Sequence, residues 1–402
     1  MRSLRVVSTS FADLGVPPEL VAALSARGID MPFPVQVATI PDALAGRDLC
    51  GKAPTGSGKT LAFGIPLVMR TTAARPKRPT SLVLVPTREL AAQVADELAA
   101  LGKPFGHRVV SVYGGVSLGP QVDRLAKGAS IVVACPGRLL DLIDQRALRL
   151  EEVTTVVLDE ADRMADMGFL PDVRQLLDAT APGRQIILFS ATLDGDVDRL
   201  VDRYQRDPVT HDVTPPDSDV GHVDHVFWRV DAADRVRTTA EIVDRLGTTI
   251  VFCRTKHGAD RVARQLGQWN VKAAAIHGDR SQGQRQRALD DFEAGKVRAL
   301  VATDVAARGI HVDAVGAVVH FDPPADQKDY RHRSGRTGRA GLDGTVITLV
   351  TDKLAPAVGA LQRALDLPVE VSPNGTWPGD QRSPTVAPGG VGGVAVVPTR
   401  LA

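Results

Sequence analysis

Short runs of aliphatic and β-branched residues alternate with longer amphipathic segments along most of the chain. In the first half these apolar runs lie at residues 48–50, 80–85, 109–112, 131–134, 155–158 and 186–189. Helical patterns, with apolar residues three or four positions apart, lie between them at 61–69, 88–101 and 118–125. Continuous apolar strands that alternate with helices predict a parallel sheet covered on both faces, the α/β class.

The alternation stops once and then resumes. Residues 207–221 read DPVTHDVTPPDSDVG, which is typical of a linker. Beyond it, apolar runs recur at 249–252, 272–276, 299–301, 315–321 and 345–351, with helical patterns at 257–269 and 281–294. We therefore predict a first domain over residues 1–208, a linker over 209–224 and a second domain over 225–371. Residues 372–402 are rich in Gly and Pro and predict a flexible tail.

Composition narrows the class of protein. A chain of 402 residues with 44% hydrophobic residues can build two cores. The net charge is only +1, so a nucleic-acid surface would have to be a local basic patch. Cys50, Cys135 and Cys253 are scattered, which fits a reducing compartment better than disulfides or a metal site. No apolar run approaches a membrane span and no secretory signal is seen at the start, so we expect a cytoplasmic protein.

The sequence APTGSGKT has the setting of a phosphate-binding loop, because it follows a predicted strand and precedes a predicted helix. Glycine at positions 56 and 58 allows a tight turn that directs successive N–H groups at one anion. Lys59 is placed to reach the β- and γ-phosphates, and Thr60 to help hold Mg²⁺. A Gly-rich turn that binds nothing is the alternative. The predicted nucleotide contacts are Ala53, Pro54, Thr55, Gly56, Ser57, Gly58, Lys59 and Thr60.

The sequence Asp-Glu-Ala-Asp at 159–162 follows the apolar run at 155–158. Ligands of α/β proteins bind at the carboxyl ends of parallel strands, where these acids are expected. Asp159 is predicted to hold Mg²⁺ through water, and Glu160 to orient or deprotonate an attacking water. Acids that merely favour a helix N-terminus are the alternative.

The tripeptide Ser190-Ala191-Thr192 ends the next apolar run. Its two hydroxyls are expected to bond Asp162 and Glu160 and so to link the acids to a moving part. Alone, such a tripeptide is an ordinary turn or cap.

Residues 332–339 read HRSGRTGR and are dense in guanidinium groups. Arg336 and Arg339 would share a face if the segment were helical. An arginine brought from a second domain to a γ-phosphate accelerates hydrolysis by roughly 10³–10⁵. A solvated basic helix is the alternative.

Together, these motifs resemble those of the DEAD-box ATP-dependent RNA helicases of bacterial type, and they stand in the family's order from Phe11 to Thr351. In the first half, PFPVQ at 32–36 resembles the family's Q motif, PTREL at 86–90 motif Ia, Gly114 with Gly115 the Gly-Gly pair and CPGR at 135–138 motif Ib. In the second half, VFCRT at 251–255 resembles motif IV, Gln282 with Arg285 the Q-x-x-R pair and ATDVAARG at 302–309 motif V.

The resemblance implies two tandem RecA-like domains with parallel sheets flanked by helices, joined by a flexible linker. ATP and Mg²⁺ would bind in the cleft between them, with Phe11 and Gln36 at the adenine. It implies the catalytic residues Lys59, Glu160, His332, Arg336 and Arg339. The implied RNA path follows the residues Pro86, Thr87, Arg88, Gly114, Gly115, Pro136, Gly137, Arg138, Arg254, Gln282, Arg285, Thr303 and Gly309.

Hydroxyls, backbone N–H groups and single arginines suit phosphates and sugars, so binding without sequence readout is expected. The implied activity is RNA-stimulated ATP hydrolysis, coupled to domain closure and to local, non-processive unwinding of short duplexes or remodelling of RNA–protein complexes. A monomeric core is expected, and proteins of ribosome assembly or RNA degradation are the implied partners.

Four positions depart from the family pattern: Ile29 replaces an aromatic residue, Phe33 a small hydroxyl residue, Cys135 a threonine and His311 an aspartate. Position 311 is associated with the nucleotide ribose. A neutral imidazole accepts one hydrogen bond from a ribose hydroxyl and an imidazolium none. We therefore expect weaker ATP binding or coupling, with a dependence on pH, and His311→Asp should lower the KM for ATP.

Three other functions stay open at this point. The chain could be an ATP-gated RNA clamp that never unwinds, which a duplex-release assay separates. It could act on DNA, which a comparison of RNA and DNA stimulation decides. It could lack turnover, against which the intact Lys59, Glu160, Arg336 and Arg339 argue.

Overall fold

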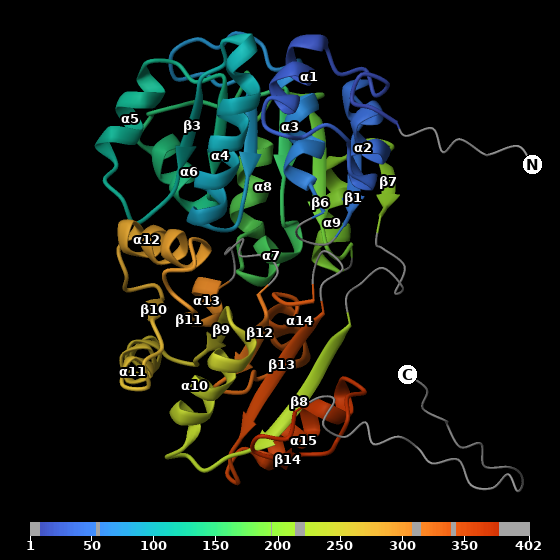
Figure 1. The fold of residues 1–402 in the computed structure, drawn as a ribbon. Helices are drawn as coiled ribbons and strands as arrows, with labels where there is room; N and C mark the ends of the chain where they lie inside the picture. The colour runs from blue at the N-terminus through green and yellow to red at the C-terminus, as the bar shows by residue number, and fades with distance from the viewer. Residues whose placement is uncertain are drawn as a thin grey trace, which may run out of the picture.

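The computed structural model describes residues 9–53, 57–193, 195–213, 222–307, 315–338 and 343–377. These residues form two α/β domains, each around a seven-stranded sheet in which the paired strands run parallel. Figure 1 shows the first domain above the second. The predicted α/β class and the division into two domains are confirmed. Within the described part of the chain, no helix has the length and apolar character needed to cross a membrane.

The first sheet has the strand order β3-β4-β2-β5-β6-β1-β7. Its strands are β1 Leu49–Lys52, β2 Ser81–Leu84, β3 Val109–Val112, β4 Ile131–Ala134, β5 Thr155–Leu158, β6 Gln185–Ser190 and β7 Val209–Asp212. Every residue of β2, β4, β5 and β6 is buried, because helices cover both faces of this sheet.

Two apolar cores lie on either side of this sheet. One contains residues from α1 Pro18–Ser25, α2 Pro34–Leu44, α3 Lys59–Arg70 and α4 Arg88–Gly102. The other contains residues from α5 Gly119–Ala126, α6 Pro136–Asp144, α7 Ala161–Asp166, α8 Leu170–Asp178 and α9 Asp196–Tyr204. A short 3₁₀ helix, η1 Lys103–Phe105, follows α4.

The second sheet repeats this plan with the strand order β10-β11-β9-β12-β13-β8-β14. Its strands are β8 Val223–Arg229, β9 Thr249–Phe252, β10 Ala273–Ile276, β11 Ala299–Ala302, β12 Ala317–His320, β13 Gly344–Val350 and β14 Ser372–Pro373. One face packs on α10 Arg235–Leu246 and α11 Lys256–Gly267. The other packs on α12 Gln282–Glu293, α13 Asp304–Ala307, α14 Gln327–Ser334 and α15 Ala355–Ala364.

The predicted linker and tail are both wrong at their edges. Residues 209–212 form β7, which pairs with β1, and β8 begins at Val223, so both lie inside the predicted linker. Residues 372–377 belong to the second domain rather than to a tail. There β14 pairs with β8, and the Trp377 ring lies edge-on to Trp228 at 4.8 Å between centroids. Residues 214–221 and 378–402 lie outside the described ranges.

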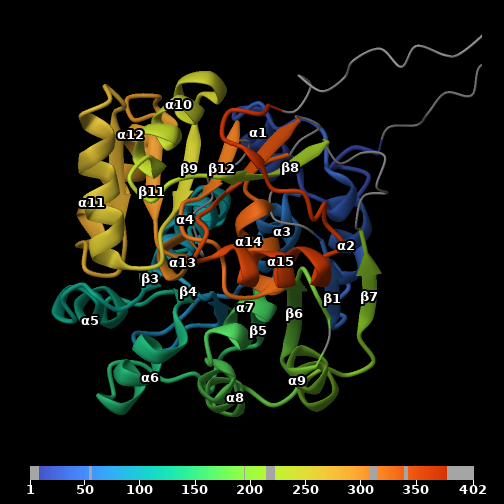
Figure 2. The same cartoon turned by 90° about the horizontal axis from the view of Figure 1, so that it is seen from below.

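The carboxyl edges of the two sheets face each other. All paired strands of a sheet run the same way, so the loops after them gather at one edge. At the junction, α12 of the second domain contacts α4 of the first through Gln282 and Glu89, and α14 contacts α7 through Lys328 and Asp166. Figure 1 shows this junction from the side, and Figure 2 shows the same layers from below. The loops that carry the predicted site residues therefore meet at the junction between the domains.

Candidate active site and nucleic-acid interface

The phosphate-binding loop runs from β1 to α3, and its last glycine is held in a conformation that few other residues adopt. Gly58 caps α3 with φ +87°. A Cβ at this position would lie 2.5 Å from Gln36 Nε2 and 2.6 Å from the Phe33 ring, so glycine is required for space as well as for backbone angle. Lys59 begins α3, is 8% exposed, and donates from Nζ to the Ala53 carbonyl at 2.9 Å. Pro54, Thr55 and Gly56 lie outside the described residues.

Gln36 joins α2 to this loop. Its side chain is 1% exposed, donates to the Gly58 carbonyl at 3.0 Å and accepts from the Phe33 N–H at 2.9 Å. The Phe33 ring beside it is 55% exposed. Phe11 is only 1% exposed and belongs to the core beneath α1 and α2, against which Ile29 also packs. Phe33 is thus the aromatic side chain that projects into solvent next to the loop.

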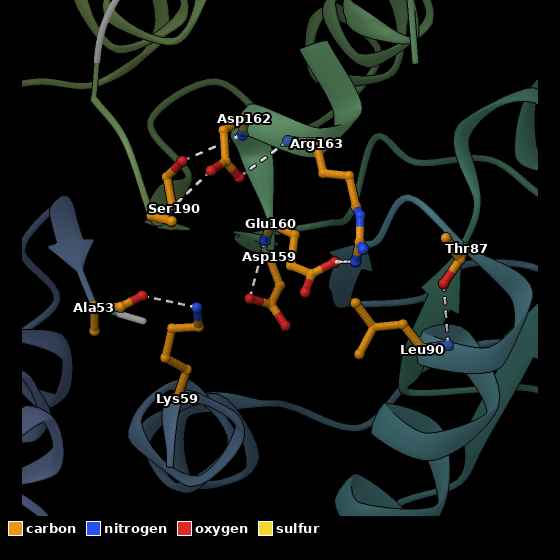
Figure 3. Close-up of polar contacts among 10 residues, drawn as sticks. Ala53, Lys59, Thr87, Leu90, Asp159, Glu160, Asp162, Arg163 and Ser190 are labelled. Carbon is orange, nitrogen blue, oxygen red and sulfur yellow. Dashed lines mark hydrogen bonds and ion pairs between the residues drawn. The ribbon is translucent and has the colours of Figure 1, made fainter. Parts of the chain in front are cut away.

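Two acids follow β5 and face the loop (Figure 3). Asp159 is 3% exposed, and its Oδ1 accepts from the Glu160 N–H at 3.0 Å. Burial raises the pKa of Asp159 to about 7, and the Glu160 carboxylate adds to the rise, whereas the nearby Lys59 cation opposes it. Glu160 has φ +52°, a backbone conformation that costs a residue other than glycine about 1 kcal/mol or more.

Arg163 holds the Glu160 carboxylate, a contact that the sequence analysis missed. The two side chains form an ion pair one turn apart at the start of α7, and each is 8% exposed (Figure 3). The spacing of three residues on a helix was the available signal. Because the pair is buried, removal of Arg163 would take away a cation that compensates the buried Glu160 carboxylate.

The sequence analysis predicted that the hydroxyls of Ser190 and Thr192 contact the acids that follow β5. The structure shows such a contact for the Ser190 hydroxyl. The Asp162 N–H donates to Ser190 Oγ at 3.2 Å, and Asp162 Oδ2 accepts from the Ala191 N–H at 3.2 Å (Figure 3). This joins the end of β6 to the start of α7. Thr192 is exposed.

These residues fit a magnesium nucleotide. A buried carboxylate with a raised pKa faces a lysine at the N-terminus of α3, where an anion is favoured. In the part of the chain that the structure describes, no group of three or more His, Cys, Asp or Glu side chains could hold a metal alone. Mg²⁺ is commonly held by one or two carboxylates together with substrate phosphates, which fits Asp159 with the neighbouring Thr60.

The predicted RNA residues of the first domain gather at the other half of the same edge, after β2, β3 and β4. Gly115 has φ +76°, and a Cβ there would lie 1.9 Å from the Arg88 guanidinium, so that arginine rests on the glycine. Arg138 Nη1 donates to the Val116 carbonyl at 3.1 Å, which brings a second guanidinium to the same turn. The Thr87 hydroxyl caps α4 by accepting from the Leu90 N–H at 3.3 Å. Pro86 follows β2, while Pro136 and Gly137 begin α6.

A buried polar contact joins the domains on this side. Gln282 Nε2 donates to Glu89 Oε1 at 3.0 Å, and Arg285 Nη2 lies 3.0 Å from the same oxygen. The Arg285 and Glu89 side chains are 8% and 6% exposed. The sequence analysis placed Gln282 and Arg285 on the RNA path but gave Glu89 no role. A buried acid within a helix that is otherwise apolar on that face was the missed signal.

The remaining predicted RNA residues lie at the carboxyl edge of the second sheet. Arg254 follows β9 with its side chain exposed, and its backbone N–H donates to Asp322 Oδ2 at 2.9 Å. Thr303 follows β11 and is 7% exposed. Gly309 and His311 lie outside the described residues.

The arginine-rich segment is helical only in part, which corrects the expectation of a shared helical face. α14 ends at Ser334 and is capped by Gly335, so Arg336 lies beyond the helix, while Arg339 is not among the described residues. Arg333, which the sequence analysis did not single out, binds Asp304 through two hydrogen bonds of 2.6 and 2.8 Å.

One small cavity brings the two domains together on the nucleotide side. His332 and Arg336 of the second domain line it together with Arg163 of the first. The Arg336 side chain is 6% exposed. The cation beside Glu160 and the arginine predicted for the γ-phosphate therefore face the same space across the junction.

Comparisons with known proteins agree with this arrangement. Residues 33–200 match the sequence model of the family described as DEAD/DEAH box helicase, and residues 234–341 match that of the helicase conserved C-terminal domain. The chain is 38% identical over 361 residues to the DEAD-box ATP-dependent RNA helicase CshA of Bacillus subtilis, covering 89% of this chain and 72% of that one.

Solved structures give the same result. The chain is similar to S. cerevisiae Dbp5 bound to RNA and ADP BeF3, with a TM-score of 0.76 and 28% identity over 90% of this chain and 95% of that one. It is also similar to a DEAD box protein from Methanococcus jannaschii, with a TM-score of 0.52 and 34% identity over 90% and 98% of the two chains.

Proposed function

The chain belongs to the DEAD/DEAH box helicase family and is an ATP-dependent RNA helicase with two tandem RecA-like domains, and from this premise we propose how its residues perform the reaction. ATP and RNA each favour a closed arrangement of the domains, so each raises the affinity of the other. The observation that carries this proposal is a cavity that Arg336 of the second domain shares with Arg163, the residue that binds Glu160. Lys59 and Asp159 lie beside Glu160 in the first domain.

Hydrolysis requires a water aligned with the γ-phosphorus. Glu160 orients this water and accepts its proton as the new P–O bond forms and the bond to the β-phosphate oxygen breaks. Lys59 leaves the Ala53 carbonyl to bind the β- and γ-phosphates. Arg336, together with His332 and Arg339, stabilises the charge on the transferred group, which requires closed domains.

Asp159 and Thr60 hold Mg²⁺ when the nucleotide is bound. When present, this ion neutralises negative charge on the phosphates. Asp159 must be ionised to hold the ion, and the burial of this carboxylate limits its contact with bulk water. Gln36 contacts the adenine edge. Phe33 packs on the adenine face and takes the part of the family's aromatic residue, which Ile29 replaces in this chain.

RNA binds across the loops that follow β2, β3 and β4 and those that follow β9, β10 and β11. Arg88, Arg138 and the backbone at Gly115 contact phosphates and sugars, as do Arg254 and Thr303 on the other side. The available groups are guanidiniums, hydroxyls and N–H groups, which supports binding without base readout. Closure would bend one strand away from duplex geometry, so unwinding is local and non-processive.

Arg163 keeps Glu160 in place before the nucleotide arrives. The ion pair is buried, and Arg163 lines the same cavity as Arg336, together with the carboxylates of Asp304 and Asp329. A bound γ-phosphate would bring a further anion to these arginines, which would favour closure on the triphosphate.

The experiment that tests the proposal is the steady-state ATPase rate with and without single-stranded RNA, next to Glu160→Gln. We expect strong stimulation by RNA that the variant abolishes. Turnover that ignores RNA would contradict the proposal. Release of a short RNA duplex then separates a helicase from an RNA clamp, and single-stranded DNA in place of RNA tests the choice of nucleic acid.

A further inference from the structure

The edge strand β10 leaves part of its backbone available for pairing. Within the described residues β10 has one neighbour, β11. The carbonyls of Lys272 and Ile276 point towards β11, where they accept from the N–H groups of Ala299 and Thr303. Successive residues of a strand point their N–H and C=O groups in opposite directions. The N–H and C=O groups of Ala273 and Ala275 therefore face outward.

A slot lies along this edge between two helices. α11 covers one face of the sheet and α12 the other, and β10 lies between them at the margin of the second domain (Figure 1). The slot has a volume of about 750 Å³. It continues along the start of the strand into a second hollow of about 460 Å³ that shares Ala263, Arg264 and Ala273. Three alanines form its floor, so no large side chain blocks the strand backbone.

The charges of the slot are predominantly positive. Its carboxylates already have cationic partners, because Asp260 accepts from Arg280 and His277, and Asp291 binds Lys296. Arg264 on α11 and Arg287 on α12 line the slot without a carboxylate partner among the described residues. Lys272 lines the adjoining hollow. An anionic occupant is therefore favoured on both walls.

We propose that the slot between α11 and α12 binds an extended, acidic segment of a partner protein, which adds to the second sheet as a strand next to β10. The outward N–H and C=O groups of Ala273 and Ala275 would pair with the main chain of the partner, and Arg264 and Arg287 would bind its acidic side chains. Many proteins protect an edge strand with prolines or inward charges. β10 has three consecutive alanines instead.

RNA is the less suitable occupant. No aromatic side chain lines the slot on which a base could stack. The slot also lies on a different face of α12 from the interdomain contact. Gln284, Arg287, Ala288 and Asp291 face the slot, whereas Gln282 and Arg285 face Glu89. A peptide in the slot could thus be bound without displacing the junction between the domains.

The test uses the full chain and a fluorescent, terminally blocked peptide of alternating Glu and Thr residues, long enough to span β10. Two control peptides carry Lys in place of Glu, or N-methyl groups on alternate amides so that they cannot pair as a strand. Binding is followed by fluorescence anisotropy, and hydrogen exchange reports the protection of the amides of Ala273 and Ala275. We expect saturable binding and added protection for the acidic peptide alone.

Two variants separate the parts of the proposal. Ala275→Pro removes an outward N–H without removing a bond to β11, and Arg264→Glu with Arg287→Glu reverses the charge of both walls. Each should weaken binding at least tenfold. The matched control Arg261→Glu, an exposed arginine of α11 that does not line the slot, should not. RNA-stimulated ATPase activity should stay unchanged in all three, which shows that they fold.

Several results would overturn the proposal. The first is absence of saturable binding by the acidic peptide. A second is equal binding by the N-methylated peptide or by the Ala275→Pro variant, because strand pairing would then play no part. Displacement of the peptide by single-stranded RNA, together with loss of RNA affinity in the Arg264 and Arg287 variant, would assign the slot to RNA.

Discussion

The two sides of the interdomain junction are built differently. On the RNA side, Glu89 of the first domain is bound by Gln282 and Arg285 of the second, and the ion pair is buried on both partners. On the nucleotide side, Glu160, the proposed catalytic residue, is bound by Arg163 of its own domain. An ion pair between Lys328 and Asp166 crosses the junction on this side, with the lysine side chain 60% exposed.

This difference indicates which side depends on a ligand. On the RNA side, Glu89 is bound by Gln282 and Arg285 without RNA, so this contact can hold the domains in register, although Gln282 Oε1 and Arg285 Nε are buried without a hydrogen-bond partner among the described residues. On the nucleotide side, Arg163 and Arg336 line one cavity with Asp304 and Asp329, and we propose that the γ-phosphate of a bound nucleotide adds to these contacts. We therefore expect changes at the nucleotide side to affect turnover, and changes at the RNA side to affect the coupling between RNA and ATP.

The largest effect is expected from Glu160→Gln. The variant removes the group that we propose accepts the proton of the attacking water, and loss of such a group typically costs 10²–10⁴-fold in rate. Single-turnover hydrolysis should fall by about this factor, while ATP-dependent binding of RNA persists. A variant that keeps more than about a tenth of the wild-type rate would mean that another group does this work.

A smaller effect is expected from Arg285→Ala, which leaves Glu89 buried without its cation. Loss of one partner of a buried, hydrogen-bonded charge pair at an interface costs about 2 kcal/mol or more. The RNA concentration for half-maximal ATPase stimulation should therefore rise about 30-fold, with the ATPase rate at saturating RNA largely kept.

Lys328→Ala is the matched control, because it removes a pair across the junction whose lysine is exposed. Such pairs contribute about 1 kcal/mol or less, so a change below about fivefold is expected. If Lys328→Ala and Arg285→Ala had equal effects, the contrast between the two sides would be lost.

A dependence on pH is expected at Asp159. Its folded-state pKa of about 7 is raised by burial above the ordinary value of 3.8, so the carboxyl is partly protonated at neutral pH. Without Mg²⁺, this group contributes less to stability as the pH rises from about 4 to 7, because the folded state binds the extra proton. Mg²⁺ favours the carboxylate, so binding of magnesium nucleotide should release a proton and weaken as the pH falls through 7.

Calorimetry in buffers of different ionisation enthalpy measures this proton. The release should reach a substantial fraction of one proton near pH 7 and disappear in Asp159→Asn. An unchanged release in that variant would assign the proton to another group.

The smallest effect is expected from Phe33→Ala, which removes the exposed ring beside Gly58 and Gln36. Aromatic stacking contributes about 0.5–1.5 kcal/mol, so the KM for ATP should rise by about two- to tenfold with little change in kcat. Phe33→Trp should keep the wild-type KM. Equal KM values for the alanine and tryptophan variants would show that the ring does not meet the adenine.

The central strands were predictable because their residues are apolar without interruption. The ranges 131–134 and 249–252 coincide with the central strands β4 and β9. Edge strands face solvent on one side, and their polar residues hide this signal. For this reason β7, with the sequence VTHD, was taken for a linker, and β14, with a proline, for a tail.

The motifs identified most candidate site residues, but they did not indicate which side chains these residues contact in the structure. Glu89 and Gln282 are separated by 193 positions in the sequence, and nothing in either segment indicates that they touch. Similarly, Arg163 follows a motif of four residues that was read without it. Residue types follow from the motifs, whereas the pairing of Glu89 with Gln282 depends on how the two domains are placed.

Each of the four apolar clusters in the described residues stays within one domain, so the contacts between domains are polar and charged. Closure therefore removes little apolar surface from water, and it should produce little change in heat capacity. Charged pairs cross the junction, and salt screens such pairs. A rise in ionic strength should therefore move the balance of the two arrangements towards the open form.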